Sequence, residues 1–240
     1  MSTVSCVVHP EVSAKPFDVE AVALDLDGTL LDTLPDIAEA ANRMLADLGR
    51  PRADRATVRS YIGDGIPRLT KRLLTGQRDG EPDPALFDRA LPLFERHYRD
   101  TFTLTTQPFP GVLEGLERMR AGGWRLACVT NKAVAFSEPL LEATGVLRYL
   151  DLVLGGDSLP SKKPDPGPLL HVARKFGIPP DRLLVIGDSD NDSRAGRAAG
   201  CPVVLVSYGY TGERDVRDLD ADAIVADLVE ASSLIQSAQS

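Results

Sequence analysis

The chain contains six short apolar segments, each followed by Gly, Asp or Ser and then by a helical pattern. Short segments that are rich in Val, Ile and Leu, and that do not alternate with polar residues, are typical of strands buried on both faces of a sheet. Strands that alternate with helices form a doubly wound parallel sheet, so we predict a Rossmann-like α/β fold. The six predicted strands cover residues 21–26, 124–130, 152–154, 183–186, 203–206 and 223–225.

Glycine ends three of the helical patterns between these strands. It is the residue that most readily takes the left-handed backbone conformation found at helix C-termini, so we expect each helix to stop there. The three helices are predicted over residues 112–121, 166–176 and 191–199, and they end at Gly122-Gly123, Gly177 and Gly200.

About 100 residues separate the first two predicted strands, too many for one crossover helix. Apolar residues recur in this segment at the spacing of one helix face, first over residues 37–48 and again near 69–74 and 86–94. Pro92 removes a backbone hydrogen bond within the last pattern and predicts a kink or a break. We therefore predict a flexible extension over residues 1–18, an α/β core over 19–33 and 109–240, and an inserted helical cap over 34–108, with a hinge where the chain leaves the core and returns.

The charge of the chain argues against a nucleic-acid partner. Asp and Glu number 35 against 27 Lys and Arg, a net charge of −8, and no basic run is present. Such a chain binds a phosphate backbone poorly. No apolar stretch approaches the length of a transmembrane helix, so we also expect no membrane partner.

The cysteines indicate a reducing compartment. Cys6, Cys128 and Cys201 are an odd number, lie far apart and form no CxxC motif, so we expect free thiols rather than disulfides or a zinc site. The first twenty residues lack the apolar core of a secretory signal. A cytoplasmic location is the expectation, and the oligomeric state is left open.

Polar side chains cluster where four of the predicted strands end. Asp25 and Asp27 are residues i and i+2 of an extended segment, so their carboxylates point the same way. The carboxyl ends of parallel strands share one edge of a sheet, where open α/β folds bind ligands. Oxygen ligands without sulfur suit Mg²⁺, and a cation site beside an anion site indicates phosphoryl chemistry. The other clusters are Thr130-Asn131, residues 161–166 with Lys163, and residues 187–192 with Asp188, Asp190 and Asp192.

Other interpretations explain single clusters but not the whole set. A single Asp at a strand end is most often a helix N-cap, and Asp32 and Asp192 fit that role. A calcium-binding EF-hand over residues 188–199 lacks its required Gly and Glu, because Ser193 and Ala199 stand there. The chain has no P-loop motif. Residues 208–212 are predicted to be a flexible loop.

These motifs resemble, in order and spacing, the four motifs of the haloacid dehalogenase-like hydrolases, over roughly residues 20–215. Segments 61–65, 108–112, 161–166 and 208–210 are similar to those of the bacterial phosphoglycolate phosphatases within that superfamily. The resemblance implies a Mg²⁺-dependent phosphatase that acts on a small anionic phosphate monoester, 2-phosphoglycolate, through an aspartyl-phosphate. The matching motifs are Asp25-Leu26-Asp27-Gly28-Thr29-Leu30 with Asp32-Thr33, Thr130-Asn131, Lys163-Pro164 and Gly187-Asp188-Ser189-Asp190-Asn191-Asp192.

The resemblance also implies roles for individual residues. Asp25 is the expected nucleophile, and Asp27 is the expected general acid and base. The family pattern has the catalytic lysine directly before a proline, which selects Lys163 rather than Lys162. Thr130, Asn131 and Lys163 are expected to hold the phosphoryl oxygens, while Mg²⁺ binds Asp25, the backbone carbonyl of Asp27 and Asp188, with Asp192 as a further ligand or a neighbour of the ligands.

For the substrate carboxylate we expect the backbone N–H groups of Gly65 and Ile66, at the start of a helix, together with Arg68. Phosphatases of phosphosugars, amino-sugar phosphates or pyrophosphate share all four motifs, and a phosphosugar mutase uses the same scaffold. They remain the alternatives. A receiver-type signalling domain is disfavoured, because it would need only about half of this chain.

Overall fold

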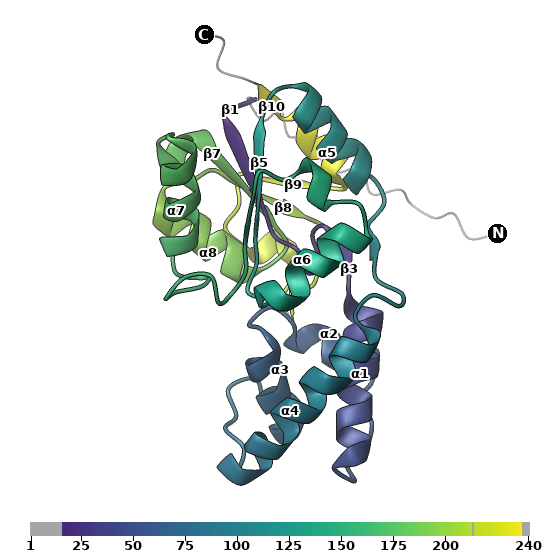
Figure 1. Ribbon diagram of the computed structural model, residues 1–240. Coiled ribbons are helices and arrows are strands. Elements are labelled where there is room, and N and C mark those ends of the chain that lie inside the picture. The colour runs from purple at the N-terminus through teal and green to yellow at the C-terminus, as the bar shows by residue number, and fades with distance from the viewer. Residues whose placement is uncertain (1–15, 213, 237–240) are drawn as a thin grey trace, which may run out of the picture.

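The computed structural model describes residues 16–212 and 214–236, which form an α/β domain and a separate group of helices below it (Figure 1). A six-stranded sheet with the order β6-β5-β2-β7-β8-β9 is the centre of the α/β domain, and all of its pairings are parallel. The predicted doubly wound fold is thereby confirmed. Its strands are β2 (Ala21–Leu24), β5 (Arg125–Val129), β6 (Leu152–Leu154), β7 (Leu183–Gly187), β8 (Val203–Val206) and β9 (Ala223–Val225).

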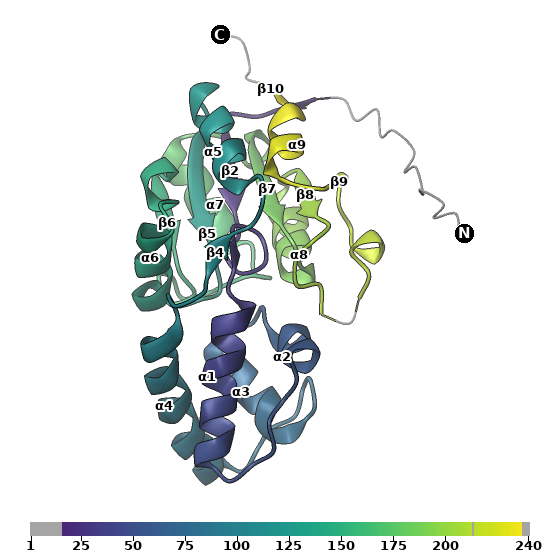
Figure 2. The same cartoon turned by 90° about the vertical axis from the view of Figure 1, so that its right-hand side faces the viewer.

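Helices cover both faces of this sheet (Figure 2). In β2, Val22 and Leu24 belong to the apolar cluster on one face, and Ala21 and Ala23 belong to the cluster on the other. Burial on both faces is the reason that the strand sequences are continuously apolar. The first face is covered by α5 (Val112–Ala121), α6 (Val134–Ala143) and α9 (Leu228–Ser233), and the second by α7 (Gly167–Phe176) and α8 (Asp190–Ala199).

All three predicted glycine helix ends contain a residue with the expected left-handed backbone. Gly177 and Gly200 have φ of 66° and 78° at the ends of α7 and α8. At the end of α5, Gly122 continues the right-handed conformation with φ −76°, and Gly123, the second glycine of the predicted pair, is the left-handed residue with φ 88°. Helices α6 and α9 were not predicted. α6 is followed by the left-handed Gly145, with φ of 71°, as the predicted helices are by their glycines, whereas no glycine ends α9.

The predicted N-terminal extension of residues 1–18 lies mainly outside the described residues, because the structure describes nothing before residue 16. Its last two residues are not an extension. They form β1 (Phe17–Asp18), which pairs in parallel with β10 (Ile235–Gln236). This pairing joins the two ends of the described chain beside the α/β domain.

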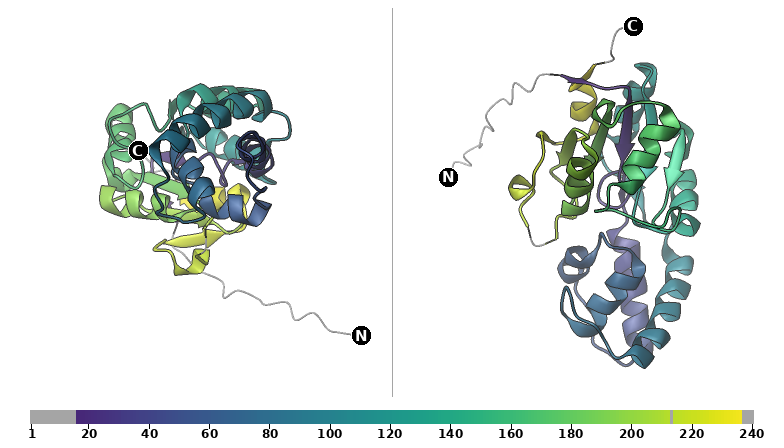
Figure 3. Two further views of the ribbon diagram at one scale, coloured as in Figure 1. Left: turned by 90° about the horizontal axis from the view of Figure 1, so that it is seen from below. Right: turned by 90° about the vertical axis from the view of Figure 1, so that its left-hand side faces the viewer.

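Four helices of the segment between β3 and β4 pack together below the carboxyl edge of the sheet (Figure 3). The last of them runs through Pro92 without interruption, so a break at that residue is wrong. We call them the four-helix segment: α1 (Leu34–Asp47), α2 (Arg55–Tyr61), α3 (Ile66–Thr75) and α4 (Pro84–Thr101).

The chain leaves the α/β domain and returns to it at one place. There β3 (Leu31–Asp32) pairs antiparallel with β4 (Gln107–Pro108). The buried carboxylate of Asp36, at the start of α1, accepts hydrogen bonds from the backbone and hydroxyl groups of Thr105 and Thr106, at 2.6 to 3.2 Å. These bonds tie the outgoing and returning connections together.

Among the residues that the structure describes, no helix combines the length and the apolar character needed to cross a membrane. Cys128 and Cys201 are buried free thiols, as expected, and Cys6 lies outside the described residues.

Candidate active site

The loop after β2 turns sharply and directs Asp25 and Asp27 to the carboxyl edge of the sheet. The turn depends on Gly28, whose φ of +89° is a conformation that side chains other than glycine rarely adopt. A Cβ at this position would lie 2.1 Å from Oδ2 of Asp188. Gly28 therefore allows the loop after β2 to approach the acidic side chain that follows β7, the neighbouring strand.

The Asp25 side chain lies close to two further carboxylates, those of Asp188 and Asp192, and to the ammonium group of Lys163. Lys163 Nζ lies 2.8 Å from Asp25 Oδ1 and 2.5 Å from Asp192 Oδ1. One carboxylate oxygen from each of Asp25, Asp188 and Asp192 lies within 4.8 Å of the others. The strand order reverses between β5-β2 and β7-β8, so this cluster lies at the topological switch point of the sheet.

Burial changes the titration of this cluster. It raises the pKa of Asp25 to about 6, although the Lys163 ammonium pulls that pKa down. Burial, together with Asp192 and Asp25, raises the pKa of Asp188 well above its usual range. Burial alone would lower the pKa of Lys163, but the adjacent Asp192 and Asp25 raise it overall. The three carboxylates thus carry more negative charge than the ammonium group of Lys163 alone can balance.

This shortage of positive charge fits a divalent cation. Asp25 Oδ1 is buried and, among the described residues, receives no well-directed hydrogen bond. A cluster of buried carboxylate oxygens with unmet charge is the donor set that Mg²⁺ prefers. The residues present therefore suit the predicted metal.

Both carboxylate oxygens of Asp192 already have partners within the protein. Its Oδ2 accepts hydrogen bonds from the Ser189 backbone at 3.1 Å, from the Ser189 hydroxyl at 2.6 Å and from the Asp188 backbone at 3.3 Å. Its Oδ1 pairs with Lys163. The N-cap of α8 is Ser189, and Asp192, two residues further into the helix than its first residue, completes a capping box with it, so the N-cap interpretation of Asp192 is wrong. Asp192 also supports Lys163.

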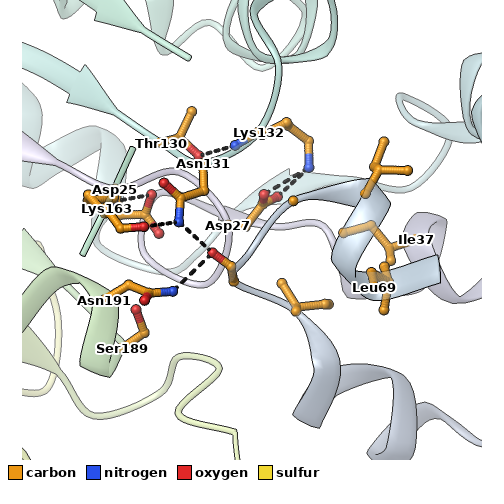
Figure 4. Close-up of a pocket in the computed structure, with 14 residues that line it drawn as sticks. Asp25, Asp27, Ile37, Leu69, Thr130, Asn131, Lys132, Lys163, Ser189 and Asn191 are labelled. Atoms are coloured by element: carbon orange, nitrogen blue, oxygen red, sulfur yellow. Dashed lines mark hydrogen bonds and ion pairs between the residues drawn. The ribbon is translucent and has the colours of Figure 1, made fainter. Parts of the chain in front are cut away.

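Asp27 is held by partners of its own (Figure 4). Lys132 Nζ lies 2.7 Å from Oδ1 and 2.8 Å from Oδ2 of Asp27, and the Thr33 hydroxyl donates to Oδ1 at 2.6 Å. Lys132 was not predicted as a site residue. It follows Thr130-Asn131 directly, but nothing in the sequence distinguishes a lysine that turns into the pocket from one that points to solvent.

Asn131 lines the pocket beside Thr130, and its side-chain amide also links two loops. Its amide nitrogen donates to the carbonyl of Lys163 at 2.8 Å and to that of Gly63 at 2.9 Å. Thr130 lines the pocket, and its hydroxyl oxygen accepts a hydrogen bond from the Lys132 backbone. The contact of Thr130 and Asn131 with a phosphoryl group stays a prediction.

The two adjacent lysines have different surroundings. Lys163 is buried between Asp25 and Asp192, whereas the ammonium of Lys162 donates to the Asp64 carbonyl of the four-helix segment at 2.7 Å. The structure thus brings Lys163, and not Lys162, to the acidic cluster.

Of the three residues expected to meet the substrate carboxylate, two lie at the pocket. Gly65 and Ile66 line it at the start of α3, and a Cβ on Gly65 would lie 3.0 Å from the Asn131 carbonyl. Arg68 does not lie there. Its guanidinium pairs with Asp79 at 3.0 Å and Glu81 at 2.7 Å, within the four-helix segment.

The loop of residues 208–212, predicted to be flexible, packs against the acidic cluster through Tyr210. The backbone N–H of Tyr210 donates to Oδ2 of Asp188, and its hydroxyl donates to Asp32 at 2.6 Å. Tyr210 is buried, and a Cβ on Gly209 would overlap the Asp188 side chain. The loop therefore fixes the acidic residue that follows β7.

A larger cavity, of about 680 Å³, adjoins the pocket and shares Ile62, Ser189 and Asn191 with it. Positive side chains outnumber carboxylates along its wall, although the whole chain is acidic. The cations are Arg68, Arg72, Arg78, Lys162, Arg194 and Arg214, and the carboxylates are Asp64, Asp79 and Asp190.

Comparisons with known proteins agree with this geometry. The haloacid dehalogenase-like hydrolase family model matches residues 19–200. The chain is 58% identical to a phosphoglycolate phosphatase of Nitrosospira multiformis, over 92% of this chain and 97% of that protein, and 52% identical to one of Thiobacillus denitrificans, over 93% and 98%. The crystal structure of a predicted phosphoglycolate phosphatase from Haemophilus somnus superposes with a TM-score of 0.86 at 34% identity, covering 91% of this chain and 98% of that one.

Proposed function

Because this chain belongs to the haloacid dehalogenase-like hydrolase family, we propose that it is a Mg²⁺-dependent phosphatase that hydrolyses 2-phosphoglycolate to glycolate and phosphate. Two relatives that are at least 52% identical over more than nine-tenths of both chains carry that activity in their names. The observation that carries the proposal is the buried group of Asp25, Asp188 and Lys163, with a second carboxylate, Asp27, lining the same pocket.

In the first half of the proposed reaction, a carboxylate oxygen of Asp25 attacks phosphorus and the ester P–O bond breaks. Asp27 gives its proton to the leaving oxygen, so glycolate departs as the alcohol. In the second half a water molecule attacks the aspartyl-phosphate and Asp27 takes a proton from that water. Inorganic phosphate leaves and both carboxyl groups return to their starting state.

Charge on the phosphoryl oxygens must be offset during both halves. Lys163, fixed by Asp192, supplies one positive charge next to Asp25, and the Thr130 hydroxyl supplies a hydrogen bond. Mg²⁺, held by Asp25, Asp188 and the backbone carbonyl of Asp27, would supply electrostatic stabilisation of the same oxygens when bound.

The pocket also suits a small anionic leaving group. Gly65 is the N-cap of the ten-residue helix α3, and Ile66 is its first residue. Backbone N–H groups at the start of a helix favour the binding of a carboxylate. Ile37, Ile62 and Leu69 form an apolar wall that limits the size of the substrate. The positive excess along the adjoining cavity favours entry of an anion.

A panel of phosphate esters tests the substrate. With Mg²⁺ present, we expect kcat/KM for phosphate release from 2-phosphoglycolate to exceed that from a hexose phosphate, an amino-sugar phosphate or pyrophosphate by about 100-fold, a difference of about 2.7 kcal/mol. Equal or higher kcat/KM for another ester would contradict the substrate but not the phosphatase reaction. Conversion of a phosphosugar to its isomer without phosphate release would favour the mutase.

A further inference from the structure

We propose that Lys132 is a positioning residue that holds the Asp27 carboxylate in the pocket, and that Tyr98 of the four-helix segment encloses its ammonium group. This inference rests on the proposed reaction, in which Asp27 protonates the leaving oxygen. It concerns a side chain beyond the residues that the four motifs supply.

The contact between Lys132 and Asp27 is close and largely shielded from solvent. The ammonium nitrogen lies within 2.8 Å of both carboxylate oxygens, and the Lys132 side chain is 4% exposed. Among the described residues Asp27 is the only carboxylate within ion-pair distance of Lys132. A buried ammonium with a single acidic partner restricts both side chains to one arrangement.

The other side of the ammonium is covered by an aromatic ring from α4. Lys132 Nζ lies 5.1 Å from the centre of the Tyr98 ring, within the range of a cation–π contact. Tyr98 is completely buried, and among the described residues its hydroxyl finds no hydrogen-bond partner. Tyr98 in turn packs against Phe136, with ring centres 5.0 Å apart, at the start of α6.

These contacts join three segments of the chain around one carboxylate. Asp27 lies in the loop after β2, Lys132 in the loop after β5, and Tyr98 in α4, the last helix of the four-helix segment. Asp27 carries its carboxylate on a short side chain in a turn. Among the described residues its side chain accepts hydrogen bonds from Lys132 and from the Thr33 hydroxyl. Lys132 thus supplies the larger part of the restraint on the proposed acid.

The lysine does not have to touch the phosphoryl group to act in this way. If it acts through Asp27, its removal will matter only where the leaving group needs a proton. The alkoxide that leaves 2-phosphoglycolate is strongly basic and needs one, whereas the carboxylate that leaves acetyl phosphate does not. The two substrates have nearly the same size, so they form a matched pair.

The test measures bond cleavage in a single turnover, with enzyme in excess, for Lys132→Met, Asp27→Asn and the double variant. For Lys132→Met we expect the cleavage rate to fall about 100-fold with 2-phosphoglycolate and less than about tenfold with acetyl phosphate. The double variant should be no slower than Asp27→Asn, because the two side chains act as one unit.

Equal losses on both substrates would overturn the proposal, since Lys132 would then act on the phosphoryl group or on the fold. An unchanged rate on 2-phosphoglycolate would do the same. If Lys132→Met alone does not fold because it leaves the Asp27 charge unpaired, the double variant removes that charge. A further tenfold loss relative to Asp27→Asn would then contradict the proposal, and equal rates would support it. Failure of Asp27→Asn itself to slow 2-phosphoglycolate cleavage would instead refute the proposed acid.

Discussion

Replacing Asp25 with asparagine is expected to lower kcat for phosphate release by at least about 10⁴-fold while leaving the protein folded. An amide of the same shape cannot attack phosphorus, so the first bond does not form. The fold should tolerate the change, because burial already disfavours the charged form of Asp25 and raises its pKa to about 6. The measurement is kcat from phosphate release, together with the thermal unfolding midpoint.

Asp100→Asn provides the matched control for this variant. Asp100 is an exposed residue of α4, outside the pocket, and the substitution makes the same chemical change. Its kcat should equal that of the unmodified chain. A folded Asp25→Asn variant that keeps more than one-tenth of the original kcat would exclude Asp25 as the nucleophile.

Lys163→Met is expected to impair both activity and stability. The lysine is the buried cation between Asp25 and Asp192, and its loss leaves their charge unpaired. Removal of one partner from a buried ion pair destabilises a protein by about 3–5 kcal/mol. Removal of a group that stabilises developing charge typically lowers kcat by about 10²–10³-fold. Denaturant unfolding and phosphate release measure the two effects separately.

The stability loss of Lys163→Met should depend on pH in one direction. Lys163 favours the ionised form of Asp25, whose pKa in the folded protein is about 6. The loss should therefore be largest above pH 6 and should shrink as the pH falls through that value, because a protonated Asp25 no longer needs the cation. Lys162→Met is the control, and its more exposed side chain predicts a stability change within about 0.5 kcal/mol at any pH. A loss for Lys163→Met that grows below pH 6 would contradict the assigned pairing.

The strands and the acidic edge could be predicted because both follow from local patterns. A strand buried on both faces must be continuously apolar, and β2, β7 and β8 are. The parallel order then brings the ends of the strands together whatever the side chains are. For this reason Asp25 and Asp188 could be predicted to meet although they lie 163 positions apart in the chain.

The features that sequence reasoning missed depend on partners that no local pattern reveals. Lys132 reaches Asp27 across 105 positions, and Tyr210 reaches Asp32 across 178. A lysine or tyrosine in a loop is usually solvated, so only the packed structure identifies these two as buried. The surroundings of Arg68 could not be predicted for the same reason, because its partners Asp79 and Glu81 lie 11 and 13 positions further along the chain.

Dependence of turnover on a divalent ion tests the central claim most directly, namely that Asp25 and Asp188 hold a metal beside the bound ester. Protein treated with EDTA and freed of it should release phosphate from 2-phosphoglycolate at less than about 1% of its full rate, a loss of more than about 2.7 kcal/mol of transition-state stabilisation. Added Mg²⁺ should restore the rate in the unmodified chain but not in Asp188→Asn. Full turnover in the presence of the chelator, or full recovery of Asp188→Asn by Mg²⁺, would contradict the account.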